Sequence, residues 1–292
     1  MKKLLGVLIA LVTTVGFAQD VKRPPITGIA YIRVYANDMD ASRKFYAKEL
    51  MLPEAKCAKK DCMRFQVGKE QFVEVLKVVP GIPDGMQVEA FRTTDVEGLR
   101  KYLESKGVKT SPVNKVADGK EIEVTDPEGH KIAFLQFSGA SDQQGAISHR
   151  MIHIGFIVKS REALDPFYIG ILGFRPYWHG GMKEERTDWV SMQVPDGSDW
   201  MEYMLNIPAD ASHRLIGVEN HFSLGVVNMV DTEAALEKTG WKSNKDEHNQ
   251  LGRDGKMQLN VFDPDDVRVE FMNFEPSAKP CCSDFTAAHP KP

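Results

Sequence analysis

The chain lacks several features that would assign it to a class at once. It has no excess of positive charge, because 37 Lys and Arg against 41 Asp and Glu give a formal net charge of −4. No basic stripe for nucleic acid is therefore expected. Its one long apolar run, Leu4 to Phe17, is too short to span a membrane comfortably. Cysteine is also scarce, with four residues in the chain.

That apolar run has the features of an export signal. Lys2 and Lys3 precede it, and Gly16-Phe17-Ala18 places small residues where a signal peptidase cuts. We therefore predict a signal peptide at residues 1–18 and a protein that is periplasmic or secreted. Removal of the two lysines makes the mature chain more acidic, and no membrane contact is expected afterwards.

Export permits disulfides, and the four cysteines fall into two pairs. Cys57 and Cys62 flank Ala-Lys-Lys-Asp, a plausible hairpin turn, so we predict a bridge between them. Cys281 and Cys282 are adjacent in the chain. Without a second pair or a histidine nearby they are weak evidence for a metal or redox site, and their state stays open.

A repeated pattern of histidine and glutamate organises the second half of the chain. His153 and His221 each lie in a strand-like apolar segment, and Glu202 and Glu270 each lie in another. Each glutamate follows its histidine by 49 residues. Any one of these residues alone would more often be a satisfied or solvent-exposed side chain. Four that repeat together favour one metal held between two copies of a unit.

The alternation of side chains along a strand supports this interpretation. His153 lies on the face shared by Gly155, opposite the apolar residues, and His221 lies on the face shared by Ser223 and Gly225. Glu270 interrupts an apolar strand, and an unpaired buried carboxylate costs several kcal/mol. Two imidazoles and two carboxylates suit a borderline divalent ion, and we leave Zn, Ni, Fe, Mn and Co open.

The mature chain divides into four similar units, each a strand, a helix and three strands. A helix capped by Asp38 is expected to reach Leu50, another is expected over Val96–Lys106, and Pro166 marks a late start or a kink in the third helix. Residues 139–146 are the expected linker. The units are expected at residues 26–79, 86–137, 149–207 and 217–274, in domains at 26–138 and 147–275, with a tail at 276–292.

This pattern resembles the vicinal oxygen chelate superfamily, which includes glyoxalase I, bleomycin-resistance proteins and extradiol dioxygenases. The resemblance rests on His153-Ile-Gly-Phe-Ile-Val, Phe167-Tyr168, Leu172-Gly173-Phe174 and Asp263-Pro264-Asp265 leading to Glu270. It implies an α+β fold in which paired βαβββ units form a curled mixed sheet around a cavity. It also implies metal ligands on the first and last strands of paired units. Those positions are His153, Glu202, His221 and Glu270.

The N-terminal half departs from the family's ligand pattern. Aligning the two halves places Tyr31 opposite His153 and Ala133 opposite Glu270, and Glu74 alone matches Glu202. One carboxylate does not hold a transition metal against water. We therefore expect the first domain to be structural or a wall of the second domain's pocket.

Three functions follow from the resemblance. The first is a glyoxalase-like lyase or isomerase, in which Glu202 or Glu270 moves a proton beside a metal-chelated pair of oxygens, with Glu202 preferred as the base. The second is an extradiol-type Fe(II) dioxygenase that uses His153, His221 and Glu270 and leaves Glu202 detached. Further groups near its metal would come from His179, Tyr203 and His248. The third is a bleomycin-resistance-like ligand-binding protein without catalysis.

Each function implies a small-molecule substrate in the cavity of the second domain. Both ligand-bearing units lie in one chain, so a monomer suffices for the site, and a homo-oligomer stays open. We expect the pocket to be lined by Trp178, His179, Arg186, Trp189, Lys256 and Gln258. The alternative is that the tryptophans belong to the core and that Arg186 and Lys256 are solvated.

Overall fold

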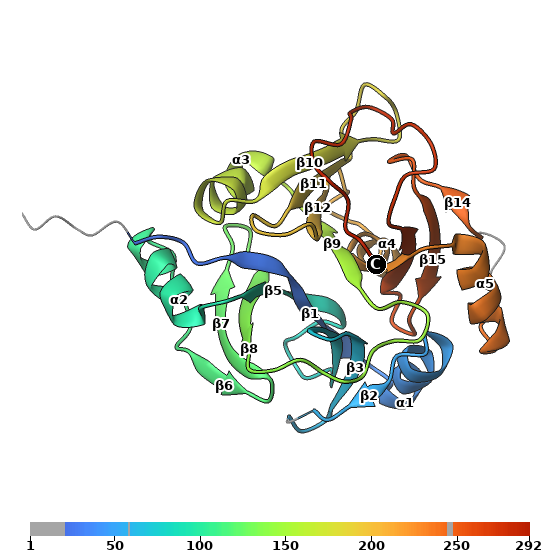
Figure 1. The fold of residues 1–292 in the computed structure, drawn as a ribbon, viewed down its shortest axis with the longest axis horizontal. Coiled ribbons are helices and arrows are strands. Elements are labelled where there is room, and N and C mark those ends of the chain that lie inside the picture. The colour runs from blue at the N-terminus through green and yellow to red at the C-terminus, as the bar shows by residue number, and fades with distance from the viewer. Residues whose placement is uncertain (1–20, 58, 244–247) are drawn as a thin grey trace, which may run out of the picture.

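The computed structural model describes residues 21–57, 59–243 and 248–292, so the expected leader at residues 1–18 lies outside the described residues. The two halves each form one eight-stranded sheet (Figure 1). The strand order is β2-β3-β4-β1-β5-β8-β7-β6 in the first sheet and β10-β11-β12-β9-β13-β16-β15-β14 in the second. The predicted fold class, four βαβββ units paired into two curled sheets, is confirmed.

The first sheet contains the first two units. Its strands are β1 (Ile26–Ala36), β2 (Glu54–Ala55), β3 (Cys62–Gly68), β4 (Gln71–Lys77), β5 (Gly85–Thr93), β6 (Asn114–Val116), β7 (Gly119–Thr125) and β8 (Lys131–Phe137). Its helical segments are α1 (Met39–Arg43), the π-helix η1 (Lys44–Glu49) and α2 (Val96–Ser105).

The second sheet repeats this plan with one additional helix. Its strands are β9 (Met151–Ile157), β10 (Arg175–Gly180), β11 (Trp189–Gln193), β12 (Trp200–Met204), β13 (His221–Val226), β14 (Gln250–Leu251), β15 (Met257–Phe262) and β16 (Arg268–Asn273). Its helical segments are α3 (Arg161–Asp165), the π-helix η2 (Pro166–Ile171), α4 (His213–Glu219) and α5 (Met229–Lys238). On these two sheets rests our proposed division into domains at residues 26–138 and 147–275.

The helices begin where the sequence indicates. The Asp38 carboxylate accepts hydrogen bonds from two backbone amides of the first turn of α1, and the Asp95 carboxylate caps α2 by accepting one from the Gly98 amide. Gly107 follows α2 with a φ of +80°, the left-handed conformation that glycine adopts readily after a helix. Pro166 stands at the start of η2, directly after α3, where the missing amide hydrogen does least harm.

The order of strands brings the candidate site residues together. Within each unit the first strand pairs in parallel with the last, as β9 does with β12 and β13 with β16. The first strands of the two units then pair antiparallel, β9 against β13. The four strands that carry His153, Glu202, His221 and Glu270 are therefore neighbours at the centre of the second sheet.

Polar contacts across the two domains repeat with approximate twofold symmetry. The Tyr46 hydroxyl donates to Asp263 Oδ2 at 2.9 Å, and the Tyr168 hydroxyl donates to Asp126 Oδ2 at 3.1 Å. Each aspartate opens the turn before the last strand of its domain. Each tyrosine comes from a π-helix of the other domain. Buried hydroxyls need such partners, so these pairs fix how the sheets meet.

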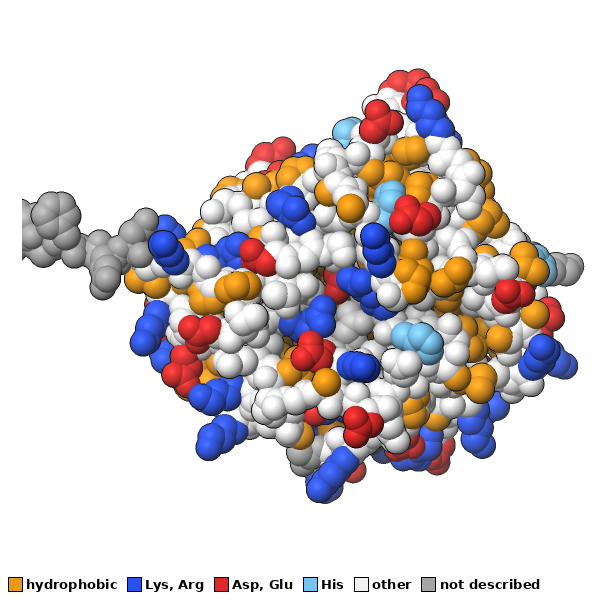
Figure 2. All heavy atoms as spheres, in the orientation of Figure 1, with side chains coloured by type: hydrophobic (Ala, Val, Ile, Leu, Met, Phe, Trp, Pro, Cys, Tyr) orange, Lys and Arg blue, Asp and Glu red, His pale blue; other side chains and the backbone are white. Residues whose placement is uncertain are grey.

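The surface and the tail complete the description. On the face shown in Figure 2, positively and negatively charged side chains are interspersed rather than gathered into a patch of one sign. The tail (dark red in Figure 1) crosses the second domain, and the Arg150 guanidinium donates to the Lys291 carbonyl near its end. No helix among the described residues is long and apolar enough to cross a membrane.

Candidate metal centre

Three side chains converge on one point above the centre of the second sheet. His153 Nε2 lies 3.0 Å from His221 Nε2 and 3.2 Å from Glu270 Oε2. All three donor atoms lie within 4.8 Å of one another, and all three residues are buried. Two donors at right angles around a metal, each at 2.0–2.2 Å, are about 3 Å apart. The spacing of these donors therefore suits a shared metal ion.

Strand register explains the convergence. His153 on β9 is paired with Ser223 on β13, and Ser223 is paired with Glu270 on β16. The two charged or polar side chains therefore flank a serine on one face of the sheet. His221 is paired with Gly155, two residues after His153, and reaches the same point from the start of β13. The shared face predicted from alternation is the face that carries the cluster.

Gly155 makes room for the His221 ring. A Cβ atom at this position would lie 2.1 Å from His221 Cε1 and 2.6 Å from Nδ1, far inside van der Waals contact. The small residues beside each histidine were predicted to leave open space. At Gly155 that space is taken by the imidazole of the other unit, which crosses over the glycine to meet His153.

The two imidazoles are oriented by different means. His221 Nδ1 lies 2.9 Å from the Glu219 carbonyl oxygen, so Nδ1 carries the hydrogen and Nε2 is left with a lone pair. The His153 ring stacks on Trp200, with ring centroids 4.8 Å apart. Its Nδ1 is buried without a hydrogen-bond partner among the described residues. Aromatic packing therefore sets the orientation of His153.

The charge states agree with ligation. Burial, with the electrostatic effect of the neighbouring Arg268 and His153 side chains, holds the pKa of His221 well below its usual range, which keeps this imidazole neutral. Burial alone would raise the pKa of Glu270, but His153, Arg268 and Lys256 outweigh it and lower the pKa. Glu270 is therefore an anion. A neutral imidazole and an ionised carboxylate are the forms that bind a metal.

These residues fit a divalent cation by a second criterion. A single hydrogen on His153 Nε2 can point at His221 Nε2 or at Glu270 Oε2, but not at both. One of the acceptors would then stay unsatisfied in a buried place, which costs free energy. A cation at the common point satisfies all three lone pairs. Two histidines and one carboxylate on one side, with room left over, are the donor set of non-haem Fe(II) oxygenases.

Glu202 lies beside this cluster but outside it. Its Oε2 is 3.9 Å from His221 Nε2, and its Oε1 accepts a hydrogen bond from the Ser191 hydroxyl at 2.8 Å. Burial, with a smaller contribution from the Glu270 carboxylate, raises the pKa of Glu202 to about 7. Four converging ligands were predicted and the structure brings three together. Ligation by Glu202 in the metal-bound protein stays a prediction.

A cavity of about 380 Å³ opens over the cluster. Aromatic side chains make up much of its wall, and a few polar and charged groups converge on it, which is typical of small-molecule sites. Trp178, Trp189 and Gln258 were predicted to line it and do. The lining residues used below are His153, Tyr177, Trp178, Trp189, Ser191, Trp200, Glu202, Arg253, Asp254, Gln258, Asn260, Arg268, Glu270 and Phe285.

The further groups proposed near a dioxygenase metal were placed wrongly. His179 is exposed, and its backbone amide bonds the Ser283 hydroxyl. His248 lies on the surface beside Glu233, with 64% of its side chain exposed. Tyr203 is one residue from Glu202 and so faces the opposite side of β12, in the core between Phe156 and Tyr168.

Three expected pocket residues do not line the cavity, because His179 and Arg186 are exposed and Lys256 is fully buried, and several wall residues were not expected. Arg186 is exposed and pairs with Asp188 at 2.6 Å, away from the cavity. Arg268 and Asn260 line the cavity, and alternation along β16 and β15 would have indicated both. Phe285 of the tail also lines it, and no pattern in the tail signals that placement.

The N-terminal domain fills the corresponding place with an ion pair. Arg33 stands opposite Glu74 in the register, as Gly155 stands opposite Glu202, and its Nε donates to Glu74 Oε2 at 2.5 Å. Tyr31 replaces the first histidine and donates to Glu121 at 2.6 Å. A guanidinium thus takes the place of a metal cation. Arg33 and Tyr31 thus account for the places at which the first sheet departs from the ligand pattern of the second.

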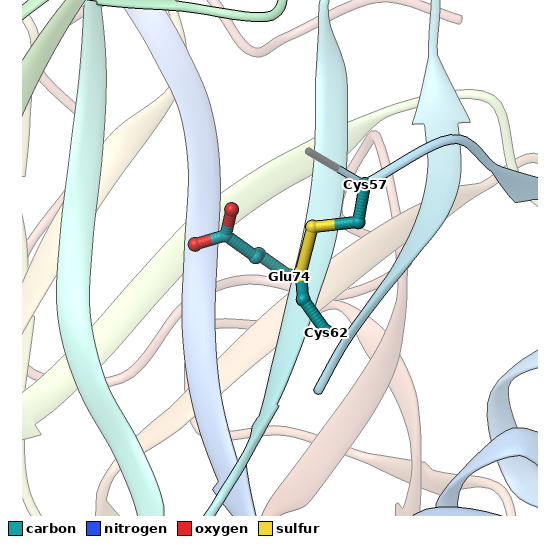
Figure 3. A group of neighbouring side chains, drawn as sticks. All are labelled: Cys57, Cys62 and Glu74. Carbon is teal, nitrogen blue, oxygen red and sulfur yellow. A yellow bond between two sulfur atoms is a disulfide. The ribbon is translucent and has the colours of Figure 1, made fainter. Parts of the chain in front are cut away.

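Glu74 also lies near the Cys57–Cys62 disulfide, as Figure 3 shows. The predicted bridge between these two cysteines is present, so neither sulfur is a thiolate that could bind a metal. The Glu74 carboxylate points away from the sulfurs (Figure 3) and is held by Arg33 and Lys59. This group is a structural crosslink.

Comparison with known protein families shows to which of them the chain belongs. Residues 28–134 and 150–271 match the model of the Glyoxalase/Bleomycin resistance protein/Dioxygenase superfamily. The chain belongs to this superfamily. The two matched segments correspond to the two sheets, and the resemblance read from the sequence is confirmed.

Individual relatives of this superfamily member are extradiol dioxygenases. An iron-dependent extradiol dioxygenase from Rhodococcus jostii (strain RHA1) is 26% identical over 230 residues, which are 69% of this chain and 75% of that protein. Homoprotocatechuate 2,3-dioxygenase from Brevibacterium fuscum, solved with 3,4-dihydroxyphenylacetate, superposes with a TM-score of 0.63 at 18% identity over 86% of this chain and 82% of that one. A room-temperature structure of an extradiol ring-cleaving dioxygenase from B. fuscum gives a TM-score of 0.65 at 18% identity, over 90% and 75%. At this identity the structures show a shared fold.

Proposed function

We propose that this protein is a ferrous extradiol-type dioxygenase that opens the ring of an aromatic vicinal diol. The observation that carries the proposal is the donor set: two imidazoles and one carboxylate converge, and Glu202 stays with Ser191. That set leaves several coordination positions for the substrate and oxygen. The iron dependence and ring chemistry named for the R. jostii relative support this choice.

The glyoxalase-like alternative requires Glu202 to act both as a metal ligand and as a base. In that reaction class the fourth protein ligand is a carboxylate that leaves the metal to move a proton. Glu202 is held 3.9 Å from His221 Nε2 by its bond to Ser191, and Glu270 supplies the one carboxylate of the cluster. The three-donor arrangement therefore favours the dioxygenase over the lyase or isomerase.

In this reaction the metal and the residues of the cavity wall would have separate roles. A ferrous ion held by His153, His221 and Glu270 supplies Lewis acidity and one-electron chemistry toward oxygen. Glu202 supplies proton transfer, because a carboxyl group with a pKa near 7 can accept or release a proton at neutral pH. The Ser191 hydroxyl holds Oε1, which leaves Oε2 directed toward the cluster for that exchange.

Aromatic residues bind and shield the reacting ring. Trp178, Trp189 and Trp200 line the cavity together with Tyr177 and Phe285. Flat apolar walls favour a flat apolar ligand, since aromatic contacts stabilise stacked or edge-on rings. The same walls exclude water from the site, which strengthens each electrostatic interaction inside it.

Oxygen consumption tests the proposal directly. The mature protein, loaded anaerobically with Fe(II), is mixed with 3,4-dihydroxyphenylacetate and oxygen, and uptake is followed beside the absorbance of the ring-opened product. We expect one oxygen consumed for each diol, and loss of both signals in His153→Ala. No oxygen uptake with any catechol, together with isomerase activity on a Zn- or Ni-loaded protein, would support the glyoxalase-like alternative instead.

We also propose that the protein is exported. The composition of residues 1–18 supports this. The Cys57–Cys62 disulfide and the second disulfide that the structure contains, Cys281–Cys282, also support it, because disulfides persist in oxidising compartments. N-terminal sequencing of protein recovered from the periplasm or medium is the test. A chain that begins after Ala18 is the expected result, and an intact Met1 in the cytoplasm would contradict it.

A further inference from the structure

Lys256 is a buried cation on the concave face of the second sheet. Its side chain is 0% exposed. It immediately precedes β15, and alternation places it on the face of Gln258 and Asn260, both of which line the cavity. Its own backbone amide donates to Asp254 Oδ1 at 3.0 Å, which fixes the turn from which the side chain extends.

The ammonium group of Lys256 is not compensated by a hydrogen bond. Its Nζ has no partner among the described residues. It lies 4.6 Å from the centroid of the Trp200 ring and 5.5 Å from that of Phe285. Aromatic faces attract a cation but replace only part of its lost hydration. Burial lowers the pKa of Lys256 to about 8, so the group is still mostly charged at neutral pH.

Two other cations, Arg253 and Arg268, line the cavity itself. The Arg253 guanidinium donates from Nε to the Gly181 carbonyl at 3.1 Å and from Nη2 to Cys281 Sγ at 2.9 Å. The positive charge of Arg268 acts to lower the pKa values of Glu202, Glu219 and Glu270, and its Nε is buried without a hydrogen-bond partner among the described residues. Lys256 therefore differs from Arg253 in that its ammonium donates no hydrogen bond to any described residue.

The position of Lys256 relates it to the metal centre. The Trp200 indole stacks on the His153 ring and also contacts the Lys256 ammonium. Trp200 and Phe285, which flank the ammonium, both line the cavity. A ligand whose ring lies against Trp200, with one end at the metal cluster, would direct a substituent at its other end between these two rings.

We propose that Lys256 binds a carboxylate substituent of the substrate, so that the site selects aromatic vicinal diols that carry an acidic side chain. This proposal rests on the proposed function and names its substrate class. The acid would complete the missing hydrogen bonds of Nζ, and its charge would offset that of the buried ammonium. A neutral diol would leave the Lys256 ammonium without hydrogen bonds and would therefore bind less tightly.

Binding of two matched probes to the Fe(II)-loaded full mature protein under anaerobic conditions tests this. The probes are 3,4-dihydroxyphenylacetate and its methyl ester, which share a ring and differ in charge, and calorimetry measures both dissociation constants. We expect the acid to bind about tenfold to a hundredfold more tightly, the range of a charge-assisted hydrogen bond. Lys256→Met should remove this preference and leave the ester unchanged. Lys256→Arg should retain most of it.

Arg253→Met is the matched control, because it removes a cavity-wall cation that already has partners. It should keep the preference for the acid. Equal binding of acid and ester by the parent protein, no binding of either, or an unchanged preference in Lys256→Met would each overturn the proposal. If the acid preference depends on Lys256 but neither probe is cleaved with oxygen uptake, the anchor stands and the dioxygenase assignment fails.

Discussion

Replacing Gly155 by alanine should weaken metal binding strongly without removing any ligand. The new methyl carbon would lie 2.1 Å from His221 Cε1 and 2.9 Å from its Nε2. Carbon atoms in contact stay about 3.5 Å apart, so the ring must move by more than 1 Å. Ligand distances are held to about 0.2 Å in working metal sites. The affinity for metal should therefore fall at least tenfold to a hundredfold.

Metal content after dialysis at a fixed free Fe(II) concentration measures this effect, and chemical denaturation measures the accompanying strain. Overpacking should cost about 1–3 kcal/mol of unfolding free energy. Gly170→Ala is the control, because its added Cβ meets nothing within 4 Å and should change neither quantity unfavourably. A Gly155→Ala protein that binds metal as tightly as the parent would refute the reasoning that His221 crosses over Gly155 to reach the cluster.

Three further predictions concern other parts of the molecule. In the metal-free protein the pKa of Glu202 is raised to about 7, so the stability that its bound proton contributes is complete below about pH 4 and is lost as pH rises through 7. Over that interval the free energy of unfolding, measured in urea, should fall by up to about 3 kcal/mol more in the parent than in Glu202→Gln. The same pH dependence in both proteins would contradict this prediction. Removing the Cys57–Cys62 bridge by a double serine substitution should lower the free energy of unfolding by about 2 kcal/mol without changing metal content, and loss of the metal would show that the bridge supports the site. Asp199→Ala should lower the free energy of unfolding by about 3–5 kcal/mol, because it leaves the Arg150 guanidinium without the fully buried carboxylate that it contacts at 2.7 Å. A decrease below about 1 kcal/mol would show that water replaces this partner.

The repeat of histidine and glutamate was enough to find the cluster. Alternation along a strand is a general rule, and the family resemblance implied ligands on the first and last strands of paired units. His153, His221 and Glu270 followed from these rules. Tyr203 could have been rejected by the same reasoning, since it is one residue from Glu202 and must face the other way.

Other features depend on contacts that no pattern encodes. Glu202 and Glu270 occupy equivalent positions, yet Glu202 bonds to Ser191 and Glu270 to His153. The residue paired with each glutamate on the neighbouring antiparallel strand differs, being Ser191 for Glu202 and Asn260 for Glu270. Phe285 reaches the cavity from a tail without periodicity. Its place follows from packing against Tyr177, 4.9 Å away between ring centroids, and from the hydrogen bonds that the Thr286 amide and hydroxyl donate to the Tyr177 and Pro176 carbonyls of β10.

Metal analysis of two glutamine variants tests the central claim most directly. Glu270→Gln and Glu202→Gln change one oxygen to nitrogen each, at equivalent positions of the two units. The three-donor site predicts that Glu202→Gln retains one Fe(II) per chain and that Glu270→Gln loses it under the same dialysis. Equal loss of metal in both variants, or retention in both, would contradict the assignment of His153, His221 and Glu270 as the ligands.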